Sequence, residues 1–418
     1  MHVVVIGAGI AGAVSAVELL RDGHQVTILE PGEPGGEQSA SYGNGGWLSP
    51  SSVLPVSSPG LWKKVPGYLA DPLGPLTIRW SYLIKALPWL TRLLTSGWTW
   101  GQVRKTAQGL GPLVAGSPTL HARLAAEAGV SDLIHRTGQL YIFPERKDYE
   151  DSRESWDIRR ENGVEYIELD ENELRQREPA LDRRYKFALY CADGGHCTNP
   201  GAYVAALVRL AEERGAKRVR GTAEGLDVQG GRLKGVRSAG AVIVCDAAVI
   251  AAGAHSRALA HAAGDRVVLE TERGYHAVIE DPEVSPRTPI MPSDGKMVHT
   301  PMQGGLRIAG QVEIAGLEAA PNWQRAEVLL DHARRTWPGL PKDLGPDRVK
   351  VWMGHRPSTP DGLPCIGKAS GCPDVVHAFG HGHIGLASGA MTGRLVADIV
   401  SGKPPTIDIR PFNPARFN

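Results

Sequence analysis

The sequence predicts an α/β fold in which buried strands lead into glycine-rich turns at the start of helices. The amino terminus shows this pattern most clearly: an apolar, β-branched strand is followed by three closely spaced glycines, a helix and a second strand that ends at Glu30. Continuous apolar runs of this kind are typical of the strands of a parallel sheet, which is covered on both faces. Three such runs that end near glycine lie at residues 3–6, 247–253 and 375–379.

The first turn, residues 7–12, has the G-x-G-x-x-G spacing of a dinucleotide-binding loop. Gly7 permits the tight turn, Gly9 lets a pyrophosphate approach the backbone, and Gly12 lets the helix at 13–20 pack close to the strand. The free N–H groups of that helix favour phosphate. Glu30 stands about 20 residues further on, where a carboxylate accepts hydrogen bonds from ribose hydroxyls. The alternative is a glycine-rich turn in an ordinary βαβ unit. An acid at this position favours FAD or NAD over NADP.

Two further segments are candidates for contact with the same ligand. A polar, glycine-rich loop at 31–46 follows Glu30, and its small residues would let a ligand approach the backbone. Residues 380–385, Gly-His-Gly-His-Ile-Gly, open a helix that we expect to reach about Val400. Two helix amino termini of this kind suit an extended ligand with separated anionic or electron-rich ends.

The composition narrows the class of protein. With 46 Lys and Arg against 45 Asp and Glu in 418 residues, there is no electrostatic reason to expect nucleic acid as a partner. The five cysteines lack a C-x-x-C pair, which favours a reducing compartment without a disulfide framework, and no metal site is predicted. The first residues lack the basic region of a signal peptide, and no apolar run is long enough to span a bilayer. We therefore expect a cytoplasmic protein of two or three domains.

Residues 47–100 differ from the rest in their many Trp and Pro residues. A helix interrupted at Pro88 is predicted over 80–94. Its apolar residues are either core of a second domain or a face that contacts a membrane or a partner. Leucine and isoleucine recur there at helical spacing, at Leu83, Ile84, Leu87, Leu90 and Leu94.

The remaining elements follow from periodicity and from turn residues. Helices are predicted at 101–135, 147–162, 171–178, 198–215 and 323–337, the fourth of them capped by Thr198 or Asn199 with Pro200 in its first turn. Strands are predicted at 25–29 and 139–143, in the alternating segment 217–245 with its turn at Gly230-Gly231, and in the β-rich segment 266–313.

Taken together, four motifs resemble the D-amino-acid oxidase-like family of FAD-dependent oxidoreductases, in particular its D-amino-acid dehydrogenase branch. They are the opening glycine motif with Glu30, residues 251–256, the stretch 354–364 (GHRPSTPDGLP) and residues 380–385. Within that branch, residues 51–53, 71–76, 271–276 and 320–323 are most similar to the glyphosate oxidoreductases, which act on an N-substituted glycine.

The resemblance implies two interleaved domains. One is a doubly wound, Rossmann-type FAD-binding domain formed by residues 1–60, 190–265 and 345–418. The other is an α+β substrate domain with a mixed sheet, formed by residues 61–189 and 266–344.

The resemblance also implies the residues of the site. FAD is expected to be noncovalent, because relatives with attached flavin carry Cys where this chain has Gly354. Arg356 would clamp the substrate carboxylate, and Tyr275 would lie over the substrate pocket. Six histidines lie near the proposed site, of which His381 and His383 rank above His255, His276, His299 and His355 as groups that touch flavin or substrate. The expected cofactor contacts are Gly7, Gly9, Ile10, Ala11, Gly12, Glu30, Ser39, Ser41, Asn44, Gly45, Gly46, Ala223, Ala252, Gly253, Gly354, Arg356, Gly380, Gly382, His383, Ile384 and Gly385.

The implied reaction is hydride transfer from the Cα of a D-amino acid or an N-substituted glycine to flavin N5. It gives an imine that hydrolyses to a keto acid and an amine or ammonia. Oxygen or a quinone would accept the electrons, and the dehydrogenase branch implies peripheral contact with the inner membrane. Two alternatives remain open: a noncatalytic, flavin-binding subunit of an amine-oxidising complex, and an NAD-dependent dehydrogenase.

Overall fold

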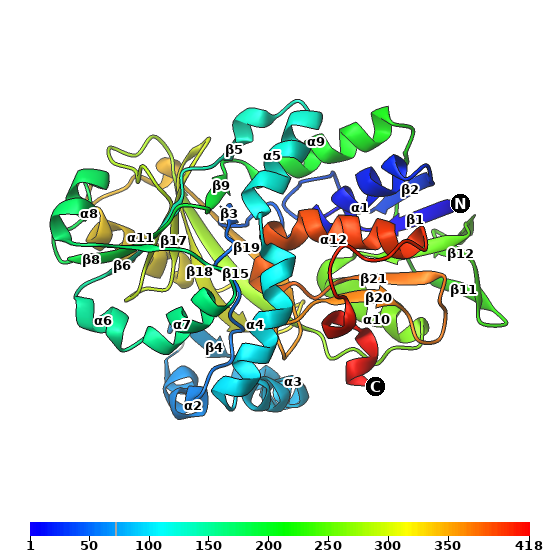
Figure 1. The fold of residues 1–418 in the computed structure, drawn as a ribbon, viewed down its shortest axis with the longest axis horizontal. Coiled ribbons are helices and arrows are strands. Elements are labelled where there is room, and N and C mark those ends of the chain that lie inside the picture. Colours follow the sequence, from blue (N-terminus) through cyan, green and yellow to red (C-terminus); the bar gives the residue numbers. More distant parts are fainter. Residues whose placement is uncertain (72) are drawn as a thin grey trace.

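Two large sheets organise the computed structural model, and they lie side by side, with β1 and β21 in one and β6 and β8 in the other (Figure 1). The structure describes residues 1–71 and 73–418. Residue 72, which belongs to the stretch 71–76 quoted above, lies outside the described residues. Neither sheet is formed by one continuous segment of the chain.

The first sheet confirms the predicted parallel strands. Its strand order is β10-β2-β1-β14-β21-β20, parallel except for the antiparallel pair β20–β21. The strand predicted at 247–253 is shorter than expected, because the chain turns away after Ile250 into a short 3₁₀ helix at Gly253–His255. The bounds are β1 (His2–Ile6), β2 (Gln25–Glu30), β10 (Lys217–Arg220), β14 (Ala247–Ile250), β20 (Cys365–Lys368) and β21 (Val375–Phe379).

Alternate residues of β1 face two different cores, which explains why residues 3–6 are all apolar. Val3 and Val5 pack with α1 (Ile10–Arg21), α9 (Pro200–Glu213) and α12 (Gly385–Val400) on one face. Val4 and Ile6 pack on the other face with α10 (Ser256–Ala262) and with the small antiparallel sheet β11 (Gly225–Gln229), β12 (Arg232–Ser238) and β13 (Ala241–Val244). The sheet is therefore covered on both sides, and the predicted doubly wound domain is confirmed.

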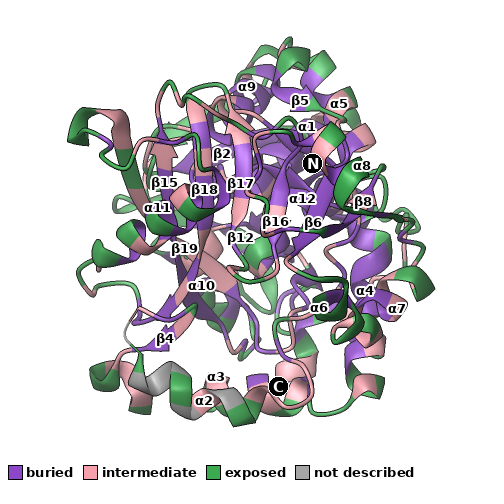
Figure 2. Ribbon diagram, turned by 90° about the vertical axis from the view of Figure 1, so that its left-hand side faces the viewer, coloured by how far each residue is buried: buried purple, intermediate pink, exposed green. Residues whose placement is uncertain are grey.

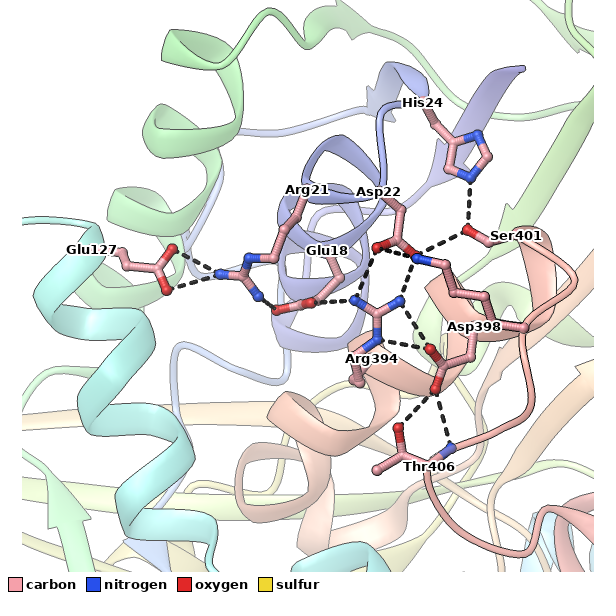
Figure 3. A network of polar contacts seen from close by, with 10 residues as sticks. Glu18, Arg21, Asp22, His24, Glu127, Arg394, Asp398, Ser401 and Thr406 are labelled. Carbon is pink, nitrogen blue, oxygen red and sulfur yellow. Dashed lines mark hydrogen bonds and ion pairs between the residues drawn. The ribbon is translucent and has the colours of Figure 1, made fainter.

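Helices α1 and α12, whose amino termini both reach the site described below, are held together along their length. A Cβ at Gly393 would lie 2.4 Å from Val14 Cγ1, so only glycine allows this approach. At the far end, Arg394 of α12 pairs with Glu18 of α1 and with Asp22, the residue that follows α1, with Nη1 2.9 Å from Glu18 and Nη2 2.5 Å from Asp22 (Figure 3). Asp398 accepts the Nε–H of the same guanidinium at 3.0 Å.

The second sheet is mixed and has nine strands in the order β19-β15-β18-β17-β16-β6-β8-β7, with β4 against β18. Helix α11 (Gln324–Thr336) packs against β15 and β18. Strand β19, which the expected boundary at residue 345 assigns to the FAD-binding domain, is hydrogen-bonded into this sheet. We retain the two-domain division as a proposal and place β19 with the second sheet. The bounds are β4 (Leu76–Ile78), β6 (Gln139–Phe143), β7 (Ile167–Leu169), β8 (Phe187–Cys191), β15 (Glu270–Ile279), β16 (Ile290–Pro292), β17 (Val298–Met302), β18 (Gly305–Ile314) and β19 (Val349–Ser358).

Two predicted helices prove to be pairs of helices. The stretch 101–135 divides at Gly116, which has a φ of +64°, and ends in a 3₁₀ turn and a short strand. The charged stretch 147–162 divides around residue 152. Asn199 caps α9, with its side chain 3.0 Å from the Ala202 N–H. The bounds are α2 (Leu61–Ala70), α3 (Leu83–Ser96), α4 (Trp100–Val114), α5 (Ser117–Glu127), α6 (Arg146–Glu150), α7 (Arg153–Glu161) and α8 (Glu171–Arg177), with a small sheet of β3 (Trp47–Leu48), β5 (Ile134–His135) and β9 (Gly195–Cys197).

Helix α3 differs from its prediction in two ways. It continues through Pro88, because the carbonyl left without a donor belongs to Ile84, which is 80% exposed and can bind water. Its buried side is formed by Ala86, Trp89 and Leu93, whereas Ile84 and Leu87 face solvent. Figure 2 shows α2 and α3 at the edge of the molecule, away from the buried sheets. Within the described ranges, no helix has both the length and the apolar character needed to cross a bilayer.

Candidate active site

A cavity of about 670 Å³ lies between the two large sheets. One side is formed where β1, β2, β14 and β21 end, together with the amino termini of α1 and α12. The other side is formed by β15, β18 and β19. Ligands of doubly wound sheets bind outside the carboxyl ends of the strands, and the volume is that of a site for a sizeable small molecule.

The first glycine motif has the geometry that its spacing predicts. Gly7 has a φ of +99°, and a Cβ there would lie 2.5 Å from the carbonyl oxygen of Ala251. A Cβ at Gly12 would lie 1.9 Å from the carbonyl oxygen of Gly7, so the start of α1 can pack against the turn only without a side chain. Gly9 is less crowded and lines the cavity, since the nearest atoms to its ideal Cβ are the Ser39 and Ser41 hydroxyls at 3.5 Å, an ordinary van der Waals distance. The backbone is therefore accessible to a ligand at Gly9.

The loop at 31–46 folds back over this helix terminus. The Ser41 hydroxyl accepts the Ile10 N–H at 3.0 Å, and the Glu30 carboxylate accepts the Ala8 N–H at 2.7 Å. Ser39, Asn44 and several glycines of the loop line the cavity beside them. The loop and the first turn thus form one continuous wall.

The second glycine-rich segment, which leads into α12, brings two histidines to the cavity wall. His383 follows Gly382 at the start of α12 and is open to the cavity. Burial within the protein and the nearby Arg356 lower the pKa of His383 to about 4. His381 is buried, and its Nε2 lies 3.0 Å from the Thr392 hydroxyl. Burial lowers the pKa of His381 to about 4 as well, so both rings are neutral at pH 7.

Arg356 lies in strand β19 rather than in a loop. It is directly opposite Glu272 of β15, and both side chains line the cavity. The Arg356 guanidinium extends across Gly274, where a Cβ would lie 2.2 Å from Arg356 Cζ. Its Nη1 donates to the carbonyl oxygen of Gln311 at 2.9 Å. Burial lowers the pKa of Arg356 while Glu272 raises it, and the arginine remains charged.

Tyr275 lines the cavity, but its hydroxyl is engaged elsewhere. It donates to Glu313 at 2.6 Å and accepts the Asn322 N–H at 3.0 Å. Burial, together with the hydrogen bond to Glu313, raises the pKa of Tyr275. Glu313 in turn is paired with Arg79 and Arg273. Tyr275 can therefore face a ligand with its ring and backbone, whereas its hydroxyl is not directed at the cavity.

Most of the predicted contacts lie together in the cavity wall. His255 and His355 line it too, whereas His276 and His299 are not among its described lining residues. Three predicted contacts, Gly12, Gly46 and Gly380, also lie outside that lining because each packs against backbone or side chains next to it. The predicted contacts that do line it are Gly7, Gly9, Ile10, Ala11, Glu30, Ser39, Ser41, Asn44, Gly45, Ala223, Ala252, Gly253, Tyr275, Gly354, Arg356, His381, Gly382, His383, Ile384 and Gly385.

Several lining residues were not predicted. Trp352 stacks on His276, with ring centroids 5.2 Å apart, and its Nε1 donates to the Glu37 carbonyl at 3.0 Å. The signal available in the sequence was the two-residue spacing of a strand, which places Trp352 on the same face as Gly354 and Arg356. Others, which reach the cavity only through the folding of the second sheet, include Glu272, Met291, Lys296, Val298, Ala309 and Gln311.

The fold and the site define a dinucleotide-binding oxidoreductase, and comparison with known proteins identifies the family. Residues 2–399 match the family described as FAD dependent oxidoreductase (DAO), and the chain belongs to it. The chain is 57% identical over 416 residues to a D-amino-acid oxidase of Bradyrhizobium diazoefficiens, covering 100% of this chain and 99% of the relative. It is 30% identical to a D-amino acid dehydrogenase of Paramagnetospirillum magneticum, with 100% and 99% covered. The structure of glycine oxidase from Geobacillus kaustophilus superimposes with a TM-score of 0.74 at 23% identity, covering 99% and 98%.

The family resemblance inferred from the sequence is therefore confirmed, and the protein is an FAD-dependent oxidoreductase. The cavity fits this cofactor on three counts. Gly9 lines the cavity with only two hydroxyls near its Cβ position, the carboxylate of Glu30 stands at the end of β2, and the start of α12 provides a second helix terminus in the cavity wall. The NAD-dependent alternative is thereby set aside.

Proposed function

We propose that this protein oxidises an α-amino acid at its Cα–N bond. The observation that carries the proposal is Arg356, a charged guanidinium in the cavity wall beside the start of α12. The planar fork of arginine matches a carboxylate bidentately. FAD, when bound, would accept the hydride from the substrate Cα. The relative at 57% identity is called a D-amino-acid oxidase, which supports the same assignment.

We propose the residue roles from the family resemblance, and their positions in the cavity support them. The first glycine turn and the start of α1 would hold the pyrophosphate, with Glu30 on the adenosine ribose. Arg356 would bind and orient the substrate carboxylate. The N–H groups at the start of α12 would stabilise negative charge at the flavin end of the cavity. FAD would be held noncovalently, since Gly354 offers no side chain for attachment.

For the substrate we place D-amino acids first and N-substituted glycines second. Two matched relatives carry D-amino acids in their names, whereas the second class rests on the sequence stretches noted above. We propose oxygen as the acceptor, because the relative with 57% identity is called an oxidase. A quinone is the alternative that the dehydrogenase relatives suggest. The noncatalytic-subunit alternative has no support in the comparisons.

The test is an anaerobic visible spectrum of the FAD-loaded protein with D-amino acids, L-amino acids and N-substituted glycines added one at a time. We expect D-amino acids to bleach the flavin bands. Admission of air then distinguishes oxygen, which restores the colour at once, from a quinone, which must be added. A flavoprotein that no member of the panel bleaches would contradict the proposal.

We also propose that the protein contacts an anionic lipid surface through an aromatic patch on α3 and the turns before and after it. Trp80 is 67% exposed and Trp98 is 55% exposed, and Ile84 and Leu87 lie between them on α3. Exposed Trp and aliphatic residues next to Lys and Arg are typical of helices that lie at a membrane interface. The segment is strongly basic: from residue 38 to residue 126 the only acid is Asp71, against Lys63, Lys64, Arg79, Lys85, Arg92, Arg104, Lys105 and Arg123.

Sedimentation with lipid vesicles tests this contact. We expect binding to vesicles that contain phosphatidylglycerol, weaker binding to pure phosphatidylcholine, and loss of binding with rising salt. The double variant I84S/W98S should abolish binding, whereas V242S/V244S, which removes exposed apolar residues from β13, should not. If the first variant instead changes only the oligomeric state, the patch is a contact between copies of this chain.

A further inference from the structure

Gln311 has a strained backbone at the point where the wall of the cavity is built. Its φ is +64°, a conformation that favours glycine, and it is only 6% exposed. It lies in a β-bulge: Arg273 pairs with Glu313 and Tyr275 pairs with Gly310, so two residues of β18 stand opposite one residue of β15. Strained residues in bulges next to a site are features that the surrounding structure must maintain.

The bulge directs two carbonyl oxygens at Arg356. Nη1 of Arg356 donates to Gln311 O at 2.9 Å, and Nη2 donates to Gly310 O at 3.4 Å. In a regular strand the carbonyls of successive residues point in opposite directions, so the bulge allows both to face one guanidinium. Arginine has five N–H groups, and the three that remain include a pair suited to a carboxylate.

The side chain of Gln311 is tied to helix α11. Its Oε1 accepts a short hydrogen bond from Nη1 of Arg325, a residue with no exposed surface. Arg325 Nη1 also donates to the carbonyl oxygen of Gly74 at 3.1 Å, and its guanidinium lies 5.9 Å from the centre of the Tyr275 ring. The buried Arg325 thus fixes the side-chain amide of Gln311, and the strained backbone of Gln311 in turn holds Arg356.

We propose that Gln311 and Arg325 are positioning residues for the substrate carboxylate. The Arg325–Gln311 hydrogen bond holds the bulge, the bulge carbonyls hold the Arg356 guanidinium, and its remaining N–H groups face the ligand in a fixed orientation. Neither Gln311 nor Arg325 needs to contact the carboxylate in this arrangement. The inference rests on the proposed role of Arg356, so the experiment must separate the two.

The test compares a carboxylate probe with its neutral amide. Binding of acetate and of acetamide to the FAD-loaded protein is followed through the change in flavin absorbance. Gln311→Met keeps the length of the side chain and removes the acceptor, and we expect it to weaken acetate binding roughly tenfold while acetamide binding stays unchanged. Arg325→Lys should weaken acetate binding, because the fork of the guanidinium is lost.

Two controls make the outcome decisive. Gln303→Met removes a glutamine that bonds Asn199 at 3.1 Å in the exposed turn before β18, and it should leave both probes unaffected. Arg356→Ala tests the clamp itself. If that variant binds acetate normally, the proposed role of Arg356 has failed. If it loses acetate while Gln311→Met and Arg325→Lys do not, or if those two weaken acetate and acetamide equally, the positioning role is wrong. In steady-state assays with an amino-acid substrate, Gln311→Met and Arg325→Lys should change KM far more than kcat.

Discussion

Glu272 of β15 and Arg356 of β19 stand directly opposite each other in the antiparallel pair, and both line the same cavity. Residues that are opposite in this way project from the same face of a sheet. Burial raises the pKa of the Glu272 carboxyl, and the Arg356 charge opposes that rise. This part of the cavity wall thus places a carboxyl group directly beside a guanidinium, much as an amino acid carries a carboxylate beside an ammonium group.

From this pairing we predict that the Glu272→Gln substitution affects two kinds of ligand differently. In the Glu272→Gln variant, a simple carboxylate such as acetate should bind roughly three- to tenfold more tightly, because a nearby negative charge is removed. An amino acid that also carries an ammonium group should gain less or bind more weakly. Flavin absorbance titrations at pH 7 measure both. Equal changes for the two ligands would show that Glu272 does not distinguish them.

Removal of Arg356 should separate substrate binding from cofactor binding. We expect Arg356→Ala to raise KM for an amino-acid substrate by roughly 100-fold or more, because a buried, charge-assisted pair is lost. FAD content should stay at the wild-type level. Arg348→Ala, which removes an exposed ion pair with Glu283 just before β19, is the matched control. An unchanged KM would remove Arg356 from the carboxylate site.

The contact between α1 and α12 predicts a large penalty for a single methyl group. In Gly393→Ala the new Cβ would lie 2.4 Å from Val14 Cγ1 and 2.8 Å from the Val14 carbonyl carbon, so the helices must separate. We expect the free energy of unfolding to fall by about 1–3 kcal/mol. Gly101→Ala in α4, where the nearest atom is 3.8 Å away, should instead be neutral or stabilising through helix propensity. Urea denaturation of both variants tests the pair.

The lowered pKa of the Asp265 carboxyl predicts how the free energy of unfolding changes in acid. Burial alone would raise the pKa of its carboxyl, but hydrogen bonds from His377 and Ser370 outweigh burial and hold the pKa at about 2, against 3.8 for the free group. The native state therefore favours the ionised form, and this stabilisation is present above pH 4 and is lost as the pH falls toward 2. It amounts to about 2 kcal/mol at pH 7.

The measurement is the free energy of unfolding of Asp265→Asn and of the wild type at pH 7 and pH 3. The difference between them should shrink by roughly half at the lower pH. Ser370→Ala removes the hydroxyl that donates to Asp265 at 2.6 Å, so it should shift the loss of stability to higher pH. A difference that is the same at both pH values would contradict the assignment.

The local parts of the site could be predicted from the sequence, because their chemistry depends on near neighbours in the chain. A glycine with φ of +99° at the end of β1, an acid at the end of β2 and a second glycine-rich helix start are each specified within a few residues. The same holds for the apolar runs of β1, β14 and β21, because both faces of these strands are covered. The family followed from these motifs.

The second wall of the cavity depended on the tertiary structure. Glu272, Gln311 and Trp352 lie far apart in the chain, and their places are set by the register of β15 with β18 and β19. A bulge shifts that register by one residue, and sequence periodicity does not reveal a bulge at a non-glycine residue. The exposed apolar side of α3 is a similar case, since both of its faces are apolar and only packing decides which one is buried. The sequence by itself therefore determined the family, the cofactor and the flavin-side turns, whereas long-range strand pairing decided which side chains face the substrate.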